Sequence, residues 1–236
     1  MGILIEEDML RERRFVFSDR QEAGRMLAAK LDQYRGTDGT VLAIPSGGVP
    51  IAAEVAGILG LCVDLIVVRK IQVPYNTEVG FGAVDPEGGV LFNEQLLGQL
   101  ALSDDEVQRQ VDKARRSVER RNRMFREGRP FPSLQKRIAI VVDDGLASGY
   151  TLKAAVRYVR KGRPSKVVAA VPTGARNAVE GMLLEVDELV CLNVRSGYPY
   201  AVADAYREWH DLCDDDVLAL IKEGTAGFGR GGCQVS

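Results

Sequence analysis

The residues best suited to chemistry lie in one segment, Val141 to Thr151, which reads Val-Val-Asp-Asp-Gly-Leu-Ala-Ser-Gly-Tyr-Thr. A wholly apolar stretch, Ile138 to Val142, runs directly into two adjacent carboxylates, Asp143 and Asp144. Aspartates favour turns, but two charges placed directly after a buried strand are costly unless they bind something. Because ionised carboxylates accept hydrogen bonds, this pair is suited to holding the two hydroxyls of a diol.

A small turn that bears hydroxyl groups follows the two aspartates and leads into an expected helix, Leu152 to Arg160. The N-terminus of a helix presents unpaired N–H groups and a partial positive charge. Such a turn, with the hydroxyls of Ser148 and Thr151, therefore suits a phosphate monoester. A diol site next to a phosphate site describes a pocket for a ribose 5-phosphate.

Apolar strands that alternate with helices predict an α/β fold, in which a parallel sheet is covered by helices on both faces. The expected strands are residues 40–44, 63–68, 138–142, 166–171 and 189–194. Ligands of open parallel sheets lie beyond the carboxyl ends of the strands, where the strand order switches. The residues at these ends are glycines, hydroxyls, cations and acids, and we expect them to converge: Pro45-Ser46-Gly47-Gly48, Arg69-Lys70, Asp143-Asp144, Pro172-Thr173-Gly174 and Arg195-Ser196.

Two of these strand ends predict a second anion site. Gly47 and Gly48 form either an ordinary turn or a loop whose backbone N–H groups approach a pyrophosphate closely. Arg69 and Lys70 are either a solvated strand end or cations that neutralise that second anion.

Helices are expected to begin at Ser18, through a capping box with Gln21, and at Ser103, through a capping box with Glu106. The second helix runs to about Arg126 and carries six arginines, which form either a solvated face or a cover over the site. Further helices are expected at 51–59 and 175–184, and the segment 73–92 should form a mobile loop and a hairpin. We expect one domain, 1–223, with an insertion at about 73–130 as a lid or cover, and a disordered tail, 224–236.

The composition narrows the functional classes. The net charge of −2 gives no reason to expect a nucleic-acid-binding protein. The single histidine, His210, argues against a histidine-rich zinc site and a Ser-His-Asp hydrolase. The four cysteines show no metal-ligand spacing, and Cys62 and Cys191 are expected as core thiols, which favours a reducing compartment. The acidic start of the chain does not read as a signal peptide, so a cytoplasmic location is expected.

The segment Val141 to Thr151 resembles the phosphoribosyl pyrophosphate (PRPP) signature of type I phosphoribosyltransferases. From about Phe15 to Leu220, the chain resembles an uncharacterised group of bacterial and archaeal predicted phosphoribosyltransferases. This likeness also runs through Phe17–Arg20, Pro45–Pro50, Val67–Ile71 and Gly80–Val84.

The resemblance implies roles for individual residues. Asp143 and Asp144 would be catalytic and hold the ribose hydroxyls, directly or through Mg²⁺, and Arg69 and Lys70 would lie near the leaving group. The 5-phosphate would be wrapped by Ala147, Ser148, Gly149, Tyr150 and Thr151, and the pyrophosphate by Ser46, Gly47 and Gly48. The acceptor would lie near Thr173, Tyr198 and Tyr200, although the tyrosines could equally be core aromatics.

Ala147 occupies the position at which hypoxanthine-guanine enzymes carry an acidic general base, so no base is identified in this chain. The implied function is transfer of ribose 5-phosphate from Mg-PRPP to an unidentified nitrogenous acceptor, with release of pyrophosphate. The alternative is a non-catalytic regulatory protein that binds PRPP or a nucleotide. The expected partners are small molecules, with neither membrane nor nucleic acid, and a homo-oligomer remains open.

Overall fold

The structure is a computed structural model that describes residues 1–222, apart from the side chains of Thr77 and Glu78. The predicted disordered tail, 224–236, lies outside the described residues. The main sheet has six strands in the order β1-β9-β8-β7-β2-β3, and every pairing in it is parallel. Its strands are β1 (Ile3–Ile5), β2 (Thr40–Ala43), β3 (Cys62–Leu65), β7 (Ile138–Val142), β8 (Lys166–Ala175) and β9 (Glu188–Arg195).

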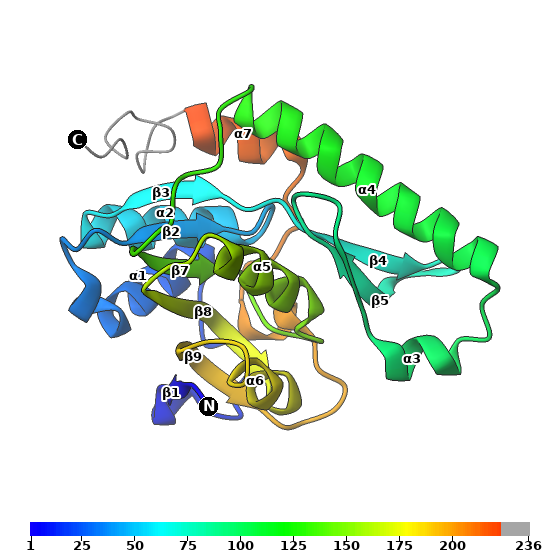
Figure 1. Ribbon diagram of the computed structural model, residues 1–236. Helices are drawn as coiled ribbons and strands as arrows, with labels where there is room; N and C mark the ends of the chain where they lie inside the picture. The colour runs from blue at the N-terminus through cyan, green and yellow to red at the C-terminus, as the bar shows by residue number, and fades with distance from the viewer. Residues whose placement is uncertain (223–236) are drawn as a thin grey trace.

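Helices cover both faces of this sheet, which confirms the predicted α/β fold (Figure 1). One face carries α1 (Arg20–Lys30) and α2 (Gly48–Leu59), and the other carries α5 (Tyr150–Lys161) and α6 (Arg176–Met182). Successive side chains of a strand point to opposite faces, so every central strand must be apolar throughout. Accordingly Val41 and Ala43 belong to the core beneath α1 and α2, while Leu42 belongs to the core beneath α5.

The order of the strands creates a switch point between β2 and β7. The chain continues from β2 through α2 to β3 on one side, and it returns on the other side of β2 as β7. The paired residues Ala43 and Val142 are the last of their strands, so the loops that follow β2 and β7 start side by side. This edge is where an open parallel sheet binds its ligand.

A second, antiparallel sheet contains β4 (Arg69–Val73), β5 (Asn76–Val84) and β6 (Val90–Phe92). The expected strand 63–68 is wrong in its second half, because β3 ends at Leu65 and the chain crosses to this sheet. The apolar run continues over Ile66 to Val68 because those side chains are buried in the crossing. The segment 73–92 is mostly strand, since β5 pairs with both β4 and β6.

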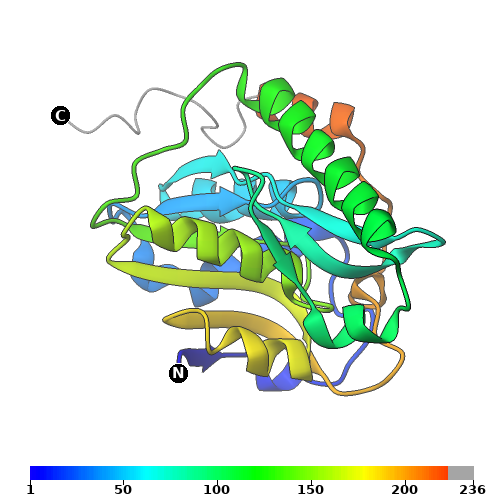
Figure 2. The ribbon, with the colours of Figure 1, turned by 45° about the vertical axis from the view of Figure 1, so that its right-hand side comes forward.

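The long helix α4 (Asp104–Arg126) lies against this second sheet, and its C-terminal part lies next to α7 (Asp214–Lys222) (Figures 1 and 2). The short helix α3 (Glu94–Gln99) precedes it. The capping box of Ser103 with Glu106 is confirmed. The predicted capping box of Ser18 with Gln21 is wrong by one residue, because the N-cap is Asp19, whose carboxylate accepts from the backbone N–H of Glu22.

The predicted core thiols differ from each other. Cys191 in β9 is fully buried with a free thiol, as expected, whereas Cys62 at the start of β3 is only partly buried. None of the described helices is long and apolar enough to cross a membrane.

Candidate functional site

The two adjacent aspartates lie at the switch point, directly beyond β7. Both are partly buried, and the Oδ1 atom of Asp143 accepts a hydrogen bond from the backbone N–H of Asp144 at 2.9 Å. Burial and the neighbouring charge of Asp144 raise the pKa of Asp143 well above its usual value. The pair therefore stores electrostatic repulsion that a cation or a hydrogen-bond donor would relieve.

Asp144 is hydrogen-bonded through its Oδ2 atom to Arg20, the first residue of α1. The Nε and Nη2 atoms of Arg20 donate to Asp144 Oδ2 at 3.1 and 3.0 Å, and Nη1 donates to the carbonyl of His210 at 2.9 Å. The guanidinium lies 3.9 Å from the centre of the Trp209 ring and is only 6% exposed as a residue. Burial raises the pKa of Asp144, and the charge and hydrogen bonds of Arg20 oppose that rise.

The backbone of Asp144 is fixed as well. The hydroxyl of Tyr206 donates to the Asp144 carbonyl at 2.7 Å, and the Tyr206 ring contacts Phe17 and Trp209. One oxygen of Asp144 thus faces Arg20, and the residue is anchored by segments from both ends of the described chain.

The turn after the aspartates is exposed where a phosphate would need it. Ala147 and Ser148 are exposed, and Gly149 caps α5 in a left-handed conformation (φ 82°) without any side-chain hydrogen bond. The first N–H groups of α5, from Tyr150 and Thr151, lack partners within the helix because no earlier turn of the helix supplies carbonyl groups for them.

This turn is also rigidly placed. Leu146 donates its N–H to the Thr173 carbonyl at 2.9 Å, and its own carbonyl accepts from Ala175 at 2.8 Å. Strand β8 continues to Ala175, beyond the predicted end at residue 171, because its last residues pair with β9 on one side and bridge to Leu146 on the other. The turn is therefore pinned to the sheet before the helix begins.

The loop after β2 approaches the aspartates closely. A Cβ atom on Gly47 would lie 1.8 Å from Asp144 Oδ2, and one on Gly48 would lie 2.6 Å from the carbonyl oxygen of Val142. Only glycine fits at these two positions, so the paired glycines allow loop 46–48 to lie against the acidic pair. The peptide bond between Pro45 and Ser46 is cis.

The predicted cations occupy a different element from the one expected. Arg69 and Lys70 begin β4 of the second sheet and are partly buried there. The pKa of Arg69 is lowered by burial and then by the positive charge of Arg121. Lys70 packs against Gly80 of β5, since a Cβ atom there would lie 2.2 Å from Lys70 Cγ.

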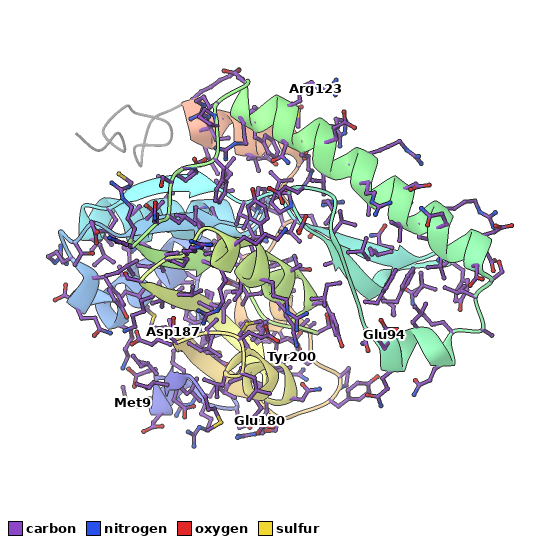
Figure 3. All side chains as sticks on the ribbon, in the orientation of Figure 1. Met9, Glu94, Arg123, Glu180, Asp187 and Tyr200 are labelled. Atoms are coloured by element: carbon purple, nitrogen blue, oxygen red, sulfur yellow. The ribbon has the colours of Figure 1, made fainter. Side chains whose placement is uncertain are left out.

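The three predicted acceptor residues are not equivalent. Thr173 is fully buried, and its hydroxyl donates to Asn193 Oδ1 at 3.3 Å and accepts from the Tyr200 hydroxyl at 3.2 Å. Tyr200 has Arg195 over its ring at 5.1 Å, and burial raises the pKa of its hydroxyl. Tyr198 is 97% exposed. Figure 3 shows Tyr200 near α6, between the end of β9 and the loop that follows.

Sequence reasoning missed Arg20, Tyr206 and Trp209 as supports of Asp144, and Arg121 as a neighbour of the site. Arg20 stood within the segment Phe17–Arg20 already singled out, but the spacing of Arg20 and Tyr206 from Asp144 along the chain carries no signal. Arg121 is one of seven arginines of α4, and it is distinguished by being buried while its Nε and Nη1 atoms have no hydrogen-bond partner among the described residues.

The fold and site define a class: α/β proteins in which a glycine loop, an acidic pair and a helix N-terminus meet at the switch-point edge of a parallel sheet. The phosphoribosyl transferase domain family matches residues 19–193, and the chain belongs to that family. The resemblance read from Val141 to Thr151 is thereby confirmed.

Individual relatives agree with this assignment. A Mycobacterium tuberculosis protein named "Putative phosphoribosyl transferase" is 38% identical over 217 residues, which are 92% of this chain and 49% of the relative. The chain thus spans about half the length of the curated relatives it matches. The crystal structure of TT1426 from Thermus thermophilus superposes with a TM-score of 0.70 at 34% identity, covering 88% of this chain and 98% of that one.

Proposed function

We propose that this protein is a phosphoribosyltransferase that takes PRPP as donor and transfers its ribose 5-phosphate group to a nitrogenous acceptor with release of pyrophosphate. The observation that carries the proposal is the junction of β2 and β7. There the Gly47-Gly48 loop, the Asp143-Asp144 pair and the start of α5 lie at one edge of the sheet. Three kinds of group then match the three parts of PRPP: a diphosphate loop, a diol site and a phosphate turn.

The backbone N–H groups of residues 147–151 would bind the 5-phosphate, since the start of α5 offers unpaired donors and the helix dipole. Asp143 and Asp144 would accept hydrogen bonds from the ribose hydroxyls. Because Arg20 occupies Oδ2 of Asp144, we assign the diol contact to Oδ1 of Asp144 and to Asp143.

Departure of pyrophosphate leaves positive charge on the sugar ring, so the protein has to stabilise charges and position the reactants rather than attack the sugar itself. The acidic pair would offset that positive charge. The amides of loop 46–48 and the cation Arg69 would stabilise the leaving diphosphate, and Lys70 is a second candidate for that role.

Magnesium fits the residues present. Mg²⁺ is usually bound through one or two carboxylates together with substrate phosphates, and Asp143 and Asp144 are two such carboxylates. No group of three His, Cys, Asp or Glu side chains among residues 1–222 could form a metal site of its own. When bound with PRPP, the ion would neutralise charge on the diphosphate.

For the acceptor, we propose that it enters beside the exposed ring of Tyr198. Thr173 and Tyr200 would then position the protein surface beside the acceptor rather than bind it, because their hydroxyl groups are hydrogen-bonded to each other. Because Ala147 cannot act as a general base in the turn, the acceptor would have to arrive in a form that can already attack the sugar.

The test is pyrophosphate release from Mg-PRPP with a panel of purine, pyrimidine and other nitrogen acceptors. We expect release with at least one acceptor and a loss of about tenfold or more in Asp144→Asn. The matched control is Asp38→Asn, because Asp38 is an exposed aspartate before β2, at the other end of the sheet. Binding of PRPP without release of pyrophosphate in the presence of any acceptor would refute the proposed transferase activity and favour the regulatory alternative.

A further inference from the structure

One buried arginine of the long helix α4 has nitrogen atoms that the described residues leave without a hydrogen-bond partner. Arg121 is 8% exposed, and its Nε and Nη1 atoms have no hydrogen-bond partner among the described residues. Arg123 of the same helix is 77% exposed as a side chain and pairs with Glu119 at 2.7 Å, and Arg126 is buried but donates to both carboxylate oxygens of Asp64. Figure 3 shows Arg123 on the outer side of α4.

The guanidinium of Arg121 lies at the glycine loop. Its Nη2 atom is 3.5 Å from the hydroxyl oxygen of Ser46, the residue before Gly47. Arg69 is close enough that the charge of Arg121 lowers its pKa, and burial lowers the pKa of both arginines. The buried cation Arg121 beside an amide-rich loop, with the partly buried cation Arg69 acting on it electrostatically, forms an environment that favours a multiply charged anion.

The nearby negative charge comes from the start of α7. Asp214 Oδ1 lies 2.6 Å from Arg121 Nη2, and Asp214 Oδ2 lies 3.1 Å from Nη2 of Arg120. Asp214 is thus shared by Arg120 and Arg121, and Arg120 is 63% exposed and solvated whereas Arg121 is buried. Arg121 therefore has one shared carboxylate and two nitrogen atoms without a partner among the described residues, and a further anion would complete its pairing.

We propose that Arg121 of α4 binds the diphosphate of the donor across from the Ser46–Gly48 loop, and that Asp214 of α7 competes with that diphosphate for its guanidinium. The proposal rests on the proposed function and extends it, because it gives the inserted helix α4 a direct ligand contact. Arg121 then supplies donors to the leaving group as it departs, while Asp214 keeps the side chain in place when the anion is absent.

The experiment measures binding of pyrophosphate with Mg²⁺, and separately of ribose 5-phosphate, by titration calorimetry. Arg121→Gln should weaken pyrophosphate binding about ten- to a hundredfold, the range expected when charge-assisted hydrogen bonds are lost. Ribose 5-phosphate binding should stay within about twofold of wild type, because that ligand uses the other half of the site. The matched control, Arg123→Gln, should leave both affinities unchanged.

A second variant separates binding from folding. Asp214→Asn keeps the shape of the side chain but removes the competing charge, so pyrophosphate should bind about threefold more tightly or better. A purely structural role for the pair predicts the opposite, with weaker binding in both variants and a lower melting temperature. That result, or wild-type pyrophosphate affinity in Arg121→Gln, would overturn the proposal.

The outcome also separates this proposal from the proposed function. Wild-type protein that binds pyrophosphate through Arg121 but binds neither ribose 5-phosphate nor PRPP would refute the proposed function and leave Arg121 as an anion ligand. Wild-type protein that binds ribose 5-phosphate but not pyrophosphate would refute the role of Arg121.

Discussion

The contact between Arg20 and Asp144 allows a quantitative test of how the acidic pair is held. Arg20→Met keeps most of the apolar stem but removes the two hydrogen bonds to Asp144, the one to the His210 carbonyl and the guanidinium over the Trp209 ring. Removing one partner of a buried ion pair costs about 3–5 kcal/mol. Since the Asp144 side chain is 18% exposed and can take up a proton, we expect the lower end, about 3 kcal/mol.

For a chain of this length, about 3 kcal/mol corresponds to a fall in melting temperature of about 6–12 °C. The loss should shrink as the pH falls. Burial raises the pKa of Asp144 in the folded protein, and removal of Arg20 raises it further. A carboxyl whose folded pKa is raised destabilises the fold at pH above that pKa, and this penalty disappears as the group is protonated. The difference between Arg20→Met and wild type should therefore be largest near neutral pH.

The assay is chemical denaturation followed by circular dichroism, carried out on Arg20→Met, Asp144→Asn and the double variant. The double-mutant cycle should give a coupling of about 2–3 kcal/mol, because Asp144→Asn no longer leaves an unpaired charge when Arg20 is absent. A coupling below about 0.5 kcal/mol would mean that Arg20 acts through Trp209 and His210 alone, and the reasoning about Asp144 would be wrong.

Three further predictions concern the same edge of the sheet. Asp143→Asn should raise stability at neutral pH by about 1 kcal/mol, because the raised pKa of Asp143 makes its charge a penalty; the gain should vanish in thermal melts as the pH falls through that pKa, and a lower melting temperature at neutral pH would contradict it. Gly47→Ala should lower the melting temperature and abolish PRPP binding in calorimetry. Gly57→Ala, with no atom within 4 Å of the new Cβ, should be neutral or stabilise by about 0.5–1 kcal/mol. Equal changes in the melting temperature and PRPP affinity of the two variants would refute the close contact of Gly47 with Asp144. Tyr206→Phe should cost about 1–3 kcal/mol in denaturation, since the Asp144 carbonyl loses its donor, and an unchanged stability would show that the bond is not formed.

Much of the fold could be predicted from the sequence because the strands are apolar on both faces. Residues 138–142 were predicted with their observed bounds, and the strands at 40–44 and 189–194 differ from the observed ones by a residue or less at each end. A buried parallel strand has to be apolar throughout, so the pattern is strong. The edge strand β1 was missed because it is three residues long and half-exposed.

Errors arose where apolar residues do not belong to the main sheet. The run to Val68 continues past β3 because it is buried in the crossing to the second sheet, and neither periodicity nor composition reveals that change of partner. The same crossing moved Arg69 and Lys70 from the expected strand end into β4. Sequence patterns describe burial, whereas the pairing of strands depends on contacts between distant segments.

For the site, the local segments could be predicted and the long-range contacts could not. The aspartates, the turn and the glycine loop are each recognisable because their chemistry depends on neighbours in sequence. Arg20 lies 124 residues from Asp144 along the chain, and Arg121 lies 75 from Ser46. A single sequence carries no signal of such pairs, and only the folded arrangement separates Arg121 from the six other arginines of its helix.

The anchoring of Asp144 limits how far this chain can be truncated for expression. Phe17 and Tyr206 pair as a β-bridge, and Arg207 donates its backbone N–H to the Phe17 carbonyl at 2.8 Å. The family match, residues 19–193, excludes both sides of this contact, which we call the terminal clasp (Phe17 with Tyr206 and Arg207). A fragment trimmed to those limits would keep every residue proposed to bind PRPP but lose Phe17, Tyr206 and Trp209. The autonomous unit is thus wider than the recognisable domain, and expression boundaries should extend beyond the terminal clasp on both sides.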